Sequence, residues 1–368
     1  MNTLKKNLAE LQQLAKKRTV KTQSIEYDLE TLVKKITRKT IKLDPEYQRN
    51  HRWSEETSSK LIESLILNIP VPLVYLSQDV DVDADDADGL ARYSVIDGQQ
   101  RLTAIYNFMT NELALEGMEV LKPLNGSKYK DLPPFLIRRL EERTIKCLRI
   151  DSTLDPQVKY DIFERLNSGS VKLEAQELRN AIYRGSFNKL IKDLAKQEDF
   201  RVLNQISLDK PDESKKVQKM EDVELVLRFF ALQNNNYKNL KKGFKVFLSD
   251  SMEELNKLSD DELIGLRSQF VKTMKVIREH FGDQAFAKYR FENLEFVQMS
   301  KFNAAVYDAL AIAVADEVNL DDPDFSKLNS TTFKELFKNS NFFDSVSGSV
   351  NDKEKVSTRI DAVKGLLK

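Results

Sequence analysis

The 368-residue sequence is poor in cysteine and histidine, with Cys147 alone and only His51 and His280. A single cysteine excludes an internal disulfide and any zinc site that needs several thiolates, and it fits a reducing cytoplasm. The sequence also shows no signal peptide and no apolar run long enough to span a bilayer. We therefore expect a cytoplasmic protein that makes no membrane contact.

Two further absences limit the functional classes. The Gly-x4-Gly-Lys-Ser/Thr loop that cradles phosphates does not occur, which excludes a P-loop NTPase. Net charge is absent as well, because 58 Lys and Arg residues balance 58 Asp and Glu residues. Any contact with DNA must therefore come from local basic surfaces rather than from the charge of the whole molecule.

Local patterns predict an α+β protein. Short segments rich in β-branched residues predict strands over residues 41–43, 73–77, 93–96 and 145–150. Beyond residue 155 no strand is predicted, and apolar residues recur at helical spacing, as in 220–232, 263–281 and 356–367. We expect a basic N-terminal arm (residues 1–24), a domain with a small mixed sheet (25–154) and a mainly α-helical C-terminal domain (155–368).

The N-terminal arm is polar and mostly basic, and its leucines recur near helical spacing at Leu4, Leu8, Leu11 and Leu14. This pattern predicts a short amphipathic helix. Such a helix can touch DNA or dock on a partner protein. It can also be a solvated terminal helix without a ligand, which is the interpretation we favour.

The segment Val95–Thr103 joins a predicted strand to a predicted helix. Asp97 has the position of an N-cap, and Gln100 follows three residues later at capping-box spacing. The first N–H groups of a helix lack partners and favour anions. Arg101 opposes the dipole there, so its presence suggests an anionic ligand, most simply a phosphate. The structural alternative is that Asp97 is only a cap and Arg101 only part of a surface ion pair.

A second candidate segment covers residues 44–53. It is dense in side chains that stack on bases or bind anions: Tyr47, Gln48, Arg49, His51, Arg52 and Trp53. Arginine and aromatic side chains in one loop can hold a base by stacking and a phosphate by forked hydrogen bonds. The alternative is that Tyr47 and Trp53 are half-buried anchors bordered by the arginines.

A third candidate is a polar corner between two predicted helices, residues 163–169 and 176–180. It carries Arg165, Asn167, Glu177, Arg179 and Asn180. These groups either line a binding site or form salt bridges that fix the two helices to each other. The sequence leaves both interpretations open.

Asp97-Gly98-Gln99-Gln100-Arg101 resembles the signature of the DGQQR family, the domain of unknown function 262. This family forms the GmrS-type N-terminal part of modification-dependent restriction systems. The segments 47–53 and 163–180 resemble further parts of its pattern. The resemblance implies a ParB/sulfiredoxin-like fold, in which an equivalent Arg-containing turn cradles nucleotide phosphates. Cys147 has no second thiol or histidine near it in sequence, so the cysteine chemistry of sulfiredoxin does not carry over.

The resemblance implies a nucleotide-binding, NTP-hydrolysing, DNA-associated protein of a bacterial defence system. Asp97 would hold Mg²⁺ or act as base, and Gln99 or Gln100 would orient a water. The implied catalytic residues are Asp97, Gln99, Gln100 and Arg101. The implied nucleotide-binding residues are Gly98, Gln100, Arg101, Thr103, Tyr47, Gln48, Arg49, Arg52 and Asn167.

Two alternatives remain from other functional classes. Many family members carry a nuclease domain with a histidine-based metal site, which two histidines cannot supply here. The protein could therefore be a non-catalytic DNA-binding or scaffold subunit that works with a separate nuclease. A metal-dependent nuclease that uses Asp44, Glu46 and Asp97 is the third possibility, although the spacing of these acids does not define a metal site.

Overall fold

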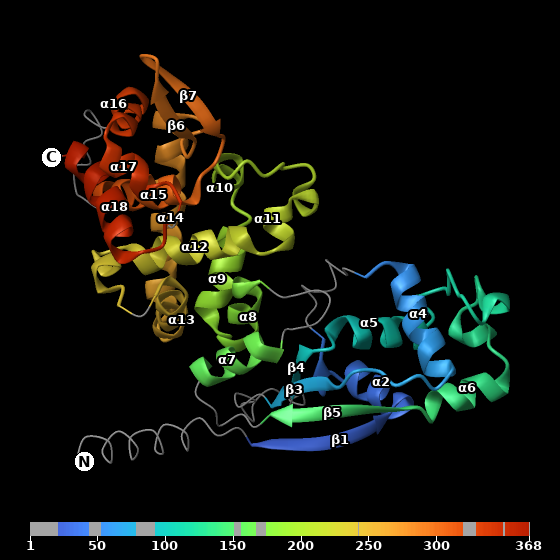
Figure 1. The fold of residues 1–368 in the computed structure, drawn as a ribbon. Coiled ribbons are helices and arrows are strands. Elements are labelled where there is room, and N and C mark those ends of the chain that lie inside the picture. The colour runs from blue at the N-terminus through green and yellow to red at the C-terminus, as the bar shows by residue number, and fades with distance from the viewer. Residues whose placement is uncertain are drawn as a thin grey trace, which may run out of the picture. The chain divides into compact units, whose positions relative to one another are not determined.

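The computed structural model of the protein describes residues 21–43, 53–78, 93–150, 156–166, 174–241, 243–318, 329–348 and 350–367. The chain forms two compact units, Met1–Lys172 and Leu173–Lys368, and each is described by itself (Figure 1). The first unit contains a mixed sheet with helices and the second is mainly helical, which confirms the predicted α+β class. Within the described residues, no helix is both long enough and apolar enough to cross a membrane.

The sheet of the first unit has five strands in the order β1-β5-β3-β4-β2. They are β1 (Thr22–Asp28), β2 (Ile41–Lys42), β3 (Val74–Gln78), β4 (Tyr93–Asp97) and β5 (Thr144–Ile150). β5 and β3 are parallel, as are β4 and β2, while β1–β5 and β3–β4 are antiparallel. The last four strands confirm the sequence prediction. β1 was not predicted, and residues 22–24 belong to it rather than to the basic arm; residues 1–20 lie outside the described part.

Helices cover the sheet and complete the core. They are α2 (Leu29–Thr37), α4 (Glu55–Ile66), α5 (Gln99–Met109), α6 (Pro134–Glu141) and α7 (Pro156–Leu166), with short 3-10 turns η1 (Lys122–Leu124) and η2 (Tyr129–Asp131). Apolar residues of α2, α4, α5 and α6 pack with those of β3 and β5 into one buried cluster. Each fully buried Leu or Ile adds about 1.5–3 kcal/mol to stability. α7 contacts β4 and lies in the first unit, whereas the sequence boundary at 154 assigned it to the helical domain.

α4 shows how the sequence sets a helix in this unit. Ser54 caps it, because its Oγ accepts a hydrogen bond from the N–H of Thr57 at 3.1 Å. Glu63 on the same helix is only 6 % exposed, and its carboxylate accepts from the N–H groups of Val120 and Leu121 at 2.8 and 2.7 Å. Burial raises the pKa of Glu63, but these backbone N–H groups outweigh burial and hold the pKa below its ordinary value. A glutamate of α4 therefore fixes the loop before η1.

The second unit consists of helices and one hairpin. The helices are α8 (Ala175–Ile182), α9 (Ser186–Leu194), α10 (Glu198–Leu203), α11 (Lys215–Gln218), α12 (Glu221–Leu232), α13 (Phe244–Leu255), α14 (Asp260–Phe281), α15 (Ala304–Val318), α16 (Ser330–Glu335), α17 (Ser340–Ser345) and α18 (Lys353–Leu367), with the 3-10 turns η3 (Pro211–Glu213), η4 (Asn236–Asn239) and η5 (Leu336–Lys338). The helices predicted over 220–232, 263–281 and 356–367 are all present within a few residues.

The prediction that no strand follows residue 155 was wrong. β6 (Lys288–Glu292) and β7 (Glu295–Ser300) form an antiparallel hairpin. Its two turn residues, Asn293 and Leu294, have φ angles of +50° and +67°. Turns of this type favour Asn-Gly, so a leucine at the second position conceals the usual sequence signal. The hairpin is held by aromatic packing, with the rings of Tyr289 and Phe337 5.7 Å apart.

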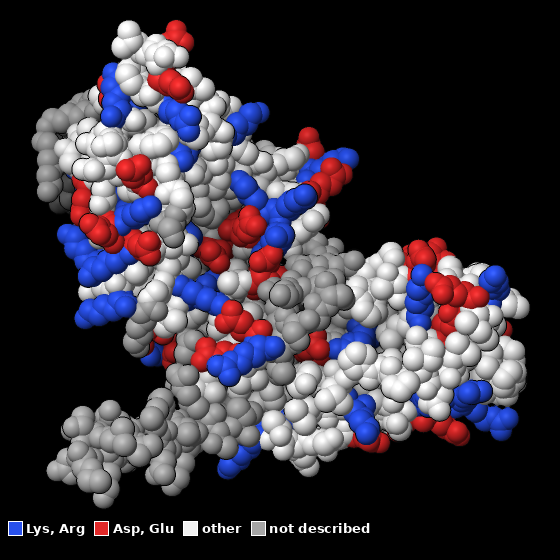
Figure 2. Space-filling view, in the orientation of Figure 1, with Lys and Arg blue, Asp and Glu red and all other residues white. Residues whose placement is uncertain are grey.

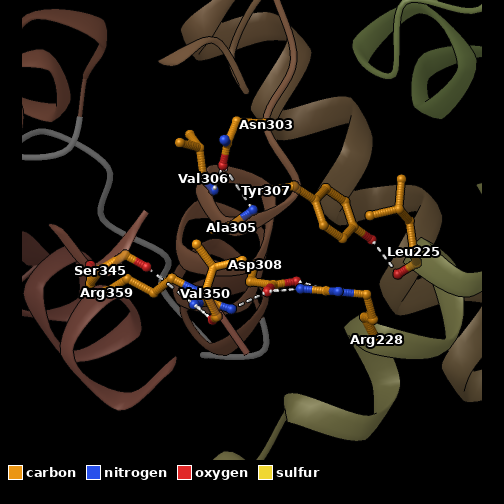
Figure 3. A network of polar contacts seen from close by, with 10 residues as sticks. All are labelled: Leu225, Arg228, Asn303, Ala305, Val306, Tyr307, Asp308, Ser345, Val350 and Arg359. Atoms are coloured by element: carbon orange, nitrogen blue, oxygen red, sulfur yellow. Dashed lines mark hydrogen bonds and ion pairs between the residues drawn. The ribbon is translucent and has the colours of Figure 1, made fainter. Parts of the chain in front are cut away.

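A buried ionic network lies in the core of the second unit (Figure 3). Asp308 of α15 accepts from Arg228 of α12 at 3.0 and 2.5 Å, and from Arg359 of α18 at 2.6 Å. Arg359 also donates to the carbonyls of Ser345 and Val350. Asp308 is 1 % exposed and Arg359 is fully buried. One carboxylate thus ties three helices together, and local sequence patterns do not reveal this because the partners are distant in the chain.

Candidate functional site

The strand–helix junction predicted from the sequence is formed by β4 and α5. Gly98 separates them with a φ angle of +100°, a region that L side chains rarely adopt. A Cβ atom on Gly98 would lie 2.9 Å from Cγ2 of Val74, so a side chain would clash with β3. Glycine is therefore required here both by the backbone conformation and by the close approach of the neighbouring strand.

The first turn of α5 begins at Gly98, not at Asp97. Gly98 is the N-cap residue and has no side chain to accept a hydrogen bond. The first intrahelical bond runs from the N–H of Leu102 to the carbonyl of Gly98 at 2.9 Å. The predicted capping box of Asp97 and Gln100 was therefore wrong. The N–H groups of the first turn point out of the positive end of the helix dipole, where an anion is stabilised.

Asp97 instead forms an ion pair with Arg101. Nη2 of Arg101 donates to Oδ2 of Asp97 at 2.8 Å, and Nη1 donates to the carbonyls of Leu73, at 3.1 Å, and Pro72. The Arg101 side chain is 12 % exposed and that of Asp97 is 32 % exposed. This pair explains how a cation is tolerated in the first turn, and it supports the structural alternative for the ion pair. The same guanidinium links α5 to the segment before β3.

Among the described residues of the junction, Gln99 has an enclosed polar atom that lacks a partner. Its Nε2 atom is shielded from solvent and makes no hydrogen bond within the described part of the chain. An enclosed donor without an acceptor costs about 1–3 kcal/mol. Gln100 lies in the same turn, and Thr103 is 5 % exposed on the following one. The junction therefore presents an enclosed amide donor next to a helix start that has no side-chain cap.

The other predicted nucleotide-binding residues cannot be placed around this junction. Tyr47, Gln48, Arg49, Arg52 and Asn167 lie outside the described residues, as do His51, Asp44 and Glu46. Trp53 is described, and it packs half-buried against the core of the first unit. This agrees with the interpretation of Trp53 as an anchor.

The part of the polar corner over residues 176–180 lies in the second unit and has a structural role. Arg179 is 1 % exposed, and its Nη1 donates to Gln176 at 2.8 Å and to Glu224 of α12 at 2.9 Å. Glu177 accepts from the N–H of Glu174 at 2.6 Å and so caps the start of α8. Asn180 is also buried. These contacts support the salt-bridged alternative for this part of the corner.

The described residues contain no cluster of three or more His, Cys, Asp or Glu side chains that could hold a metal ion. Asp97 is thus not part of a metal-binding cluster within the described residues. Cys147 is buried in β5, and burial raises the pKa of its thiol to about 11. It is a core residue without the thiolate that nucleophilic catalysis requires.

Comparison with known proteins gives a match to a family model for part of the chain. Residues 29–184 match the family model of the GmrSD restriction endonuclease, N-terminal domain. The match begins with α2, includes the junction and ends after α8, in the second unit. The resemblance predicted from the Asp97–Arg101 motif is thereby confirmed for this part of the chain. Neither a curated protein nor a solved structure gives a match.

Proposed function

We propose that the junction between β4 and α5 binds the phosphates of a nucleoside triphosphate, in a protein of a restriction-like defence system. The family description supports the second part, because it names a restriction endonuclease. The first part rests on one observation above all. Among the described residues, Nε2 of Gln99 is an enclosed donor without an acceptor, beside a helix start that has no side-chain cap.

A phosphate at this position would satisfy several groups at once. Its oxygens accept from Nε2 of Gln99 and from the N–H groups of the first turn of α5. Hydrogen bonds to a charged acceptor contribute about 1.5–3 kcal/mol each, more than bonds between neutral groups.

The ion pair between Asp97 and Arg101 offers the ligand a second binding group, the guanidinium of Arg101. A phosphate would compete with Asp97 for the guanidinium of Arg101 and leave the carboxylate available. A carboxylate beside a phosphate is a usual ligand of Mg²⁺, which supplies charge neutralisation when bound. Arg101 would then bind the negatively charged phosphate of a metal–nucleotide complex, and Asp97 would bind its positively charged metal ion.

Hydrolysis follows from the same residues. Gln99 or Gln100 would orient a water for attack, as glutamine does at other phosphate-hydrolysing sites. Asp97 would accept a proton if it is not bound to metal. Tyr47, Gln48, Arg49, Arg52, Thr103 and Asn167 complete the proposed site on the basis of the family resemblance.

The proposed partners are foreign or modified DNA and a separate nuclease. Residues 1–368 contain only two histidines, so a histidine-based nuclease site would lie outside these residues. The nucleotide site would then control when that partner acts.

Thermal shift with ATP, GTP, CTP and UTP, each with and without Mg²⁺, tests the nucleotide site. A ligand that binds only the native state raises the melting temperature by mass action. We expect one or more nucleotides to shift the wild type, and Arg101→Ala to lose that shift. Arg138→Ala, an exposed arginine on α6, is the matched control and keeps it.

Arg101→Ala also removes bonds to the Pro72 and Leu73 carbonyls, so a second variant is needed. Gln99→Glu preserves size but places a carboxylate where the phosphate would bind. We expect it to fold and to lose the nucleotide shift. No shift of the wild type with any nucleotide would contradict the proposed nucleotide site.

One observation favours the non-catalytic alternative. Arg101 is already bound to Asp97 and to two carbonyls, which is a complete structural role. In that case the protein would bind DNA as a scaffold without nucleotide. Salt-dependent DNA binding that is retained in Gln99→Glu but lost on deletion of residues 1–24, together with no nucleotide shift, would establish this alternative.

A further inference from the structure

The surface of α6 in the first unit combines an exposed aromatic ring with two arginines. The sequence Pro134–Glu141 turns Leu136 and Leu140 into the core. Phe135 points the other way and is 59 % exposed. Arg138 and Arg139 follow it at i+3 and i+4, the spacings that place side chains on one helix face. Both arginines are exposed as well.

Within the described residues, neither Arg138 nor Arg139 forms a salt bridge. The acidic Glu141 accepts instead from the hydroxyl of Tyr129 at 2.7 Å, and this contact joins η2 to α6. Glu142 is the one further acidic neighbour after the helix. The two guanidinium groups are therefore available to an anion outside the chain.

Basic residues continue along the segment that leads into α6. Lys122, Lys128 and Lys130 precede the helix, and Lys128 and Lys130 lie on either side of Tyr129 in η2. The backbone N–H of Lys130 is fixed by Oδ1 of Asn111 at 2.8 Å. Figure 2 shows both basic and acidic side chains at the end of the first unit where α6 lies in Figure 1.

A purely structural role explains only part of this pattern. Arginines in the last turn of a helix interact favourably with its dipole, which accounts for Arg138 and Arg139. It does not account for Phe135, because an aromatic ring gains nothing from the dipole and this residue is largely exposed. Exposed aromatic rings beside arginines are the elements that bind unpaired nucleic-acid bases and the phosphates that flank them.

We propose that the Phe135–Arg138–Arg139 face of α6 binds single-stranded DNA. A base stacks on the ring of Phe135, and the guanidinium groups of Arg138 and Arg139 bind the neighbouring phosphates. The lysines before the helix extend the basic path. Stacking requires an unpaired base, so the surface distinguishes a single strand from a duplex. The inference rests on the DNA association in the proposed function, for which it names α6 as the binding surface. It needs no nucleotide at the junction.

Fluorescence anisotropy with a labelled 20-nucleotide single strand, and with the duplex of the same sequence, tests the proposal on the full chain. Phe135→Leu keeps an apolar helix residue but removes the ring. Loss of one stacked base weakens binding by about 5- to 150-fold. The dependence on salt should stay unchanged, because no charge is lost. Ile264→Ala, at an exposed apolar residue of α14, is the matched control and should bind as the wild type.

The arginines make a separate prediction. For a single strand, each phosphate contact adds about −0.7 to the slope of log affinity against log salt concentration. Arg138→Gln and Arg139→Gln should each reduce the slope by roughly that amount, and the double variant by about twice as much. Arg267→Gln, on α14, is the control for a general loss of one positive charge.

The outcomes separate this surface from the junction. Loss of strand binding in Phe135→Leu together with an unchanged nucleotide shift supports the inference and leaves the nucleotide site intact. Strand binding that depends on Phe135 supports it even if no nucleotide binds. The proposal is overturned if the wild type binds no strand, if Phe135→Leu binds as tightly as the wild type, or if an acidic peptide competes as well as the strand.

Discussion

Gln99→Met separates a ligand-binding role of the junction from a structural one. Methionine has a similar length and is also an unbranched helix former, but it has no amide. If Nε2 of Gln99 has no acceptor without ligand, its removal takes away an unfavourable group rather than a bond. We therefore expect Gln99→Met to be at least as stable as the wild type in the absence of nucleotide.

The size of this effect follows from the cost of an enclosed donor. Its removal should add up to about 1 kcal/mol, at the lower end of the usual range because Gln99 is only half-buried. For 150–250 residues, 1 kcal/mol corresponds to a rise of about 2–4 °C in the melting temperature. With nucleotide bound, the stability difference between Gln99→Met and the wild type should change sign. Loss of one hydrogen bond to a charged phosphate weakens binding by about 1.5–3 kcal/mol, which is roughly tenfold or more.

Differential scanning fluorimetry of both proteins, with and without nucleotide and Mg²⁺, measures both effects. Nucleotide at a hundred times its dissociation constant stabilises the wild type by about 2.7 kcal/mol, and Gln99→Met should lose about half of that gain or more. Gln269→Met, at a half-buried helix glutamine of the second unit, is the matched control. A melting temperature that falls by several degrees in Gln99→Met without ligand would refute the reasoning, because the amide would then be structurally bonded.

Three further predictions concern the buried groups of the two units. Asp308→Ala leaves the guanidinium groups of Arg228 and Arg359 buried without a counter-charge, so urea denaturation should show a loss of about 3–5 kcal/mol; a loss below about 1 kcal/mol would contradict the network. The pKa of Glu63 is lowered in the folded state, so its stabilisation is present above the unfolded value of about 4.3 and disappears as the pH falls through the folded pKa. Glu63→Gln should therefore be less stable than the wild type at pH 7, and urea titrations should show the difference shrink below about pH 4. Cys147 should react with a thiol reagent only after unfolding, because burial raises its pKa to about 11; fast reaction of the native protein at pH 7.5 would contradict its core position.

Sequence patterns predicted the elements of the first unit better than their contacts. β-branched runs located β3, β4 and β5, and Ser54 with its acidic neighbours located the start of α4. These signals depend only on neighbouring residues, so they can be recognised without knowledge of the fold. β1 was missed, because it is polar at an edge of the sheet and is held by pairing with β5, more than 100 residues away.

The candidate site shows the same division. The motif gave the position of the junction, the glycine and the helix that follows, and β4, Gly98 and α5 of the structure confirm these three features. It did not give the direction of the Asp97 side chain. An aspartate at the position of an N-cap need not accept from the N–H groups of the helix. Here the guanidinium of Arg101, four residues later, binds the Asp97 carboxylate instead. The role of Asp308 lay beyond any local pattern, since Arg228 and Arg359 are 80 and 51 residues away.

Amide hydrogen exchange at the start of α5 tests the central claim most directly. Peptides that cover residues 97–103 should be followed in the wild type without ligand and with each triphosphate plus Mg²⁺. If phosphates bind at the junction, the N–H groups of Gln99, Gln100 and Arg101 gain acceptors, so exchange in this stretch should slow while the second unit is unchanged. A nucleotide that binds without slowing exchange here, or the absence of binding by all four, would contradict the account.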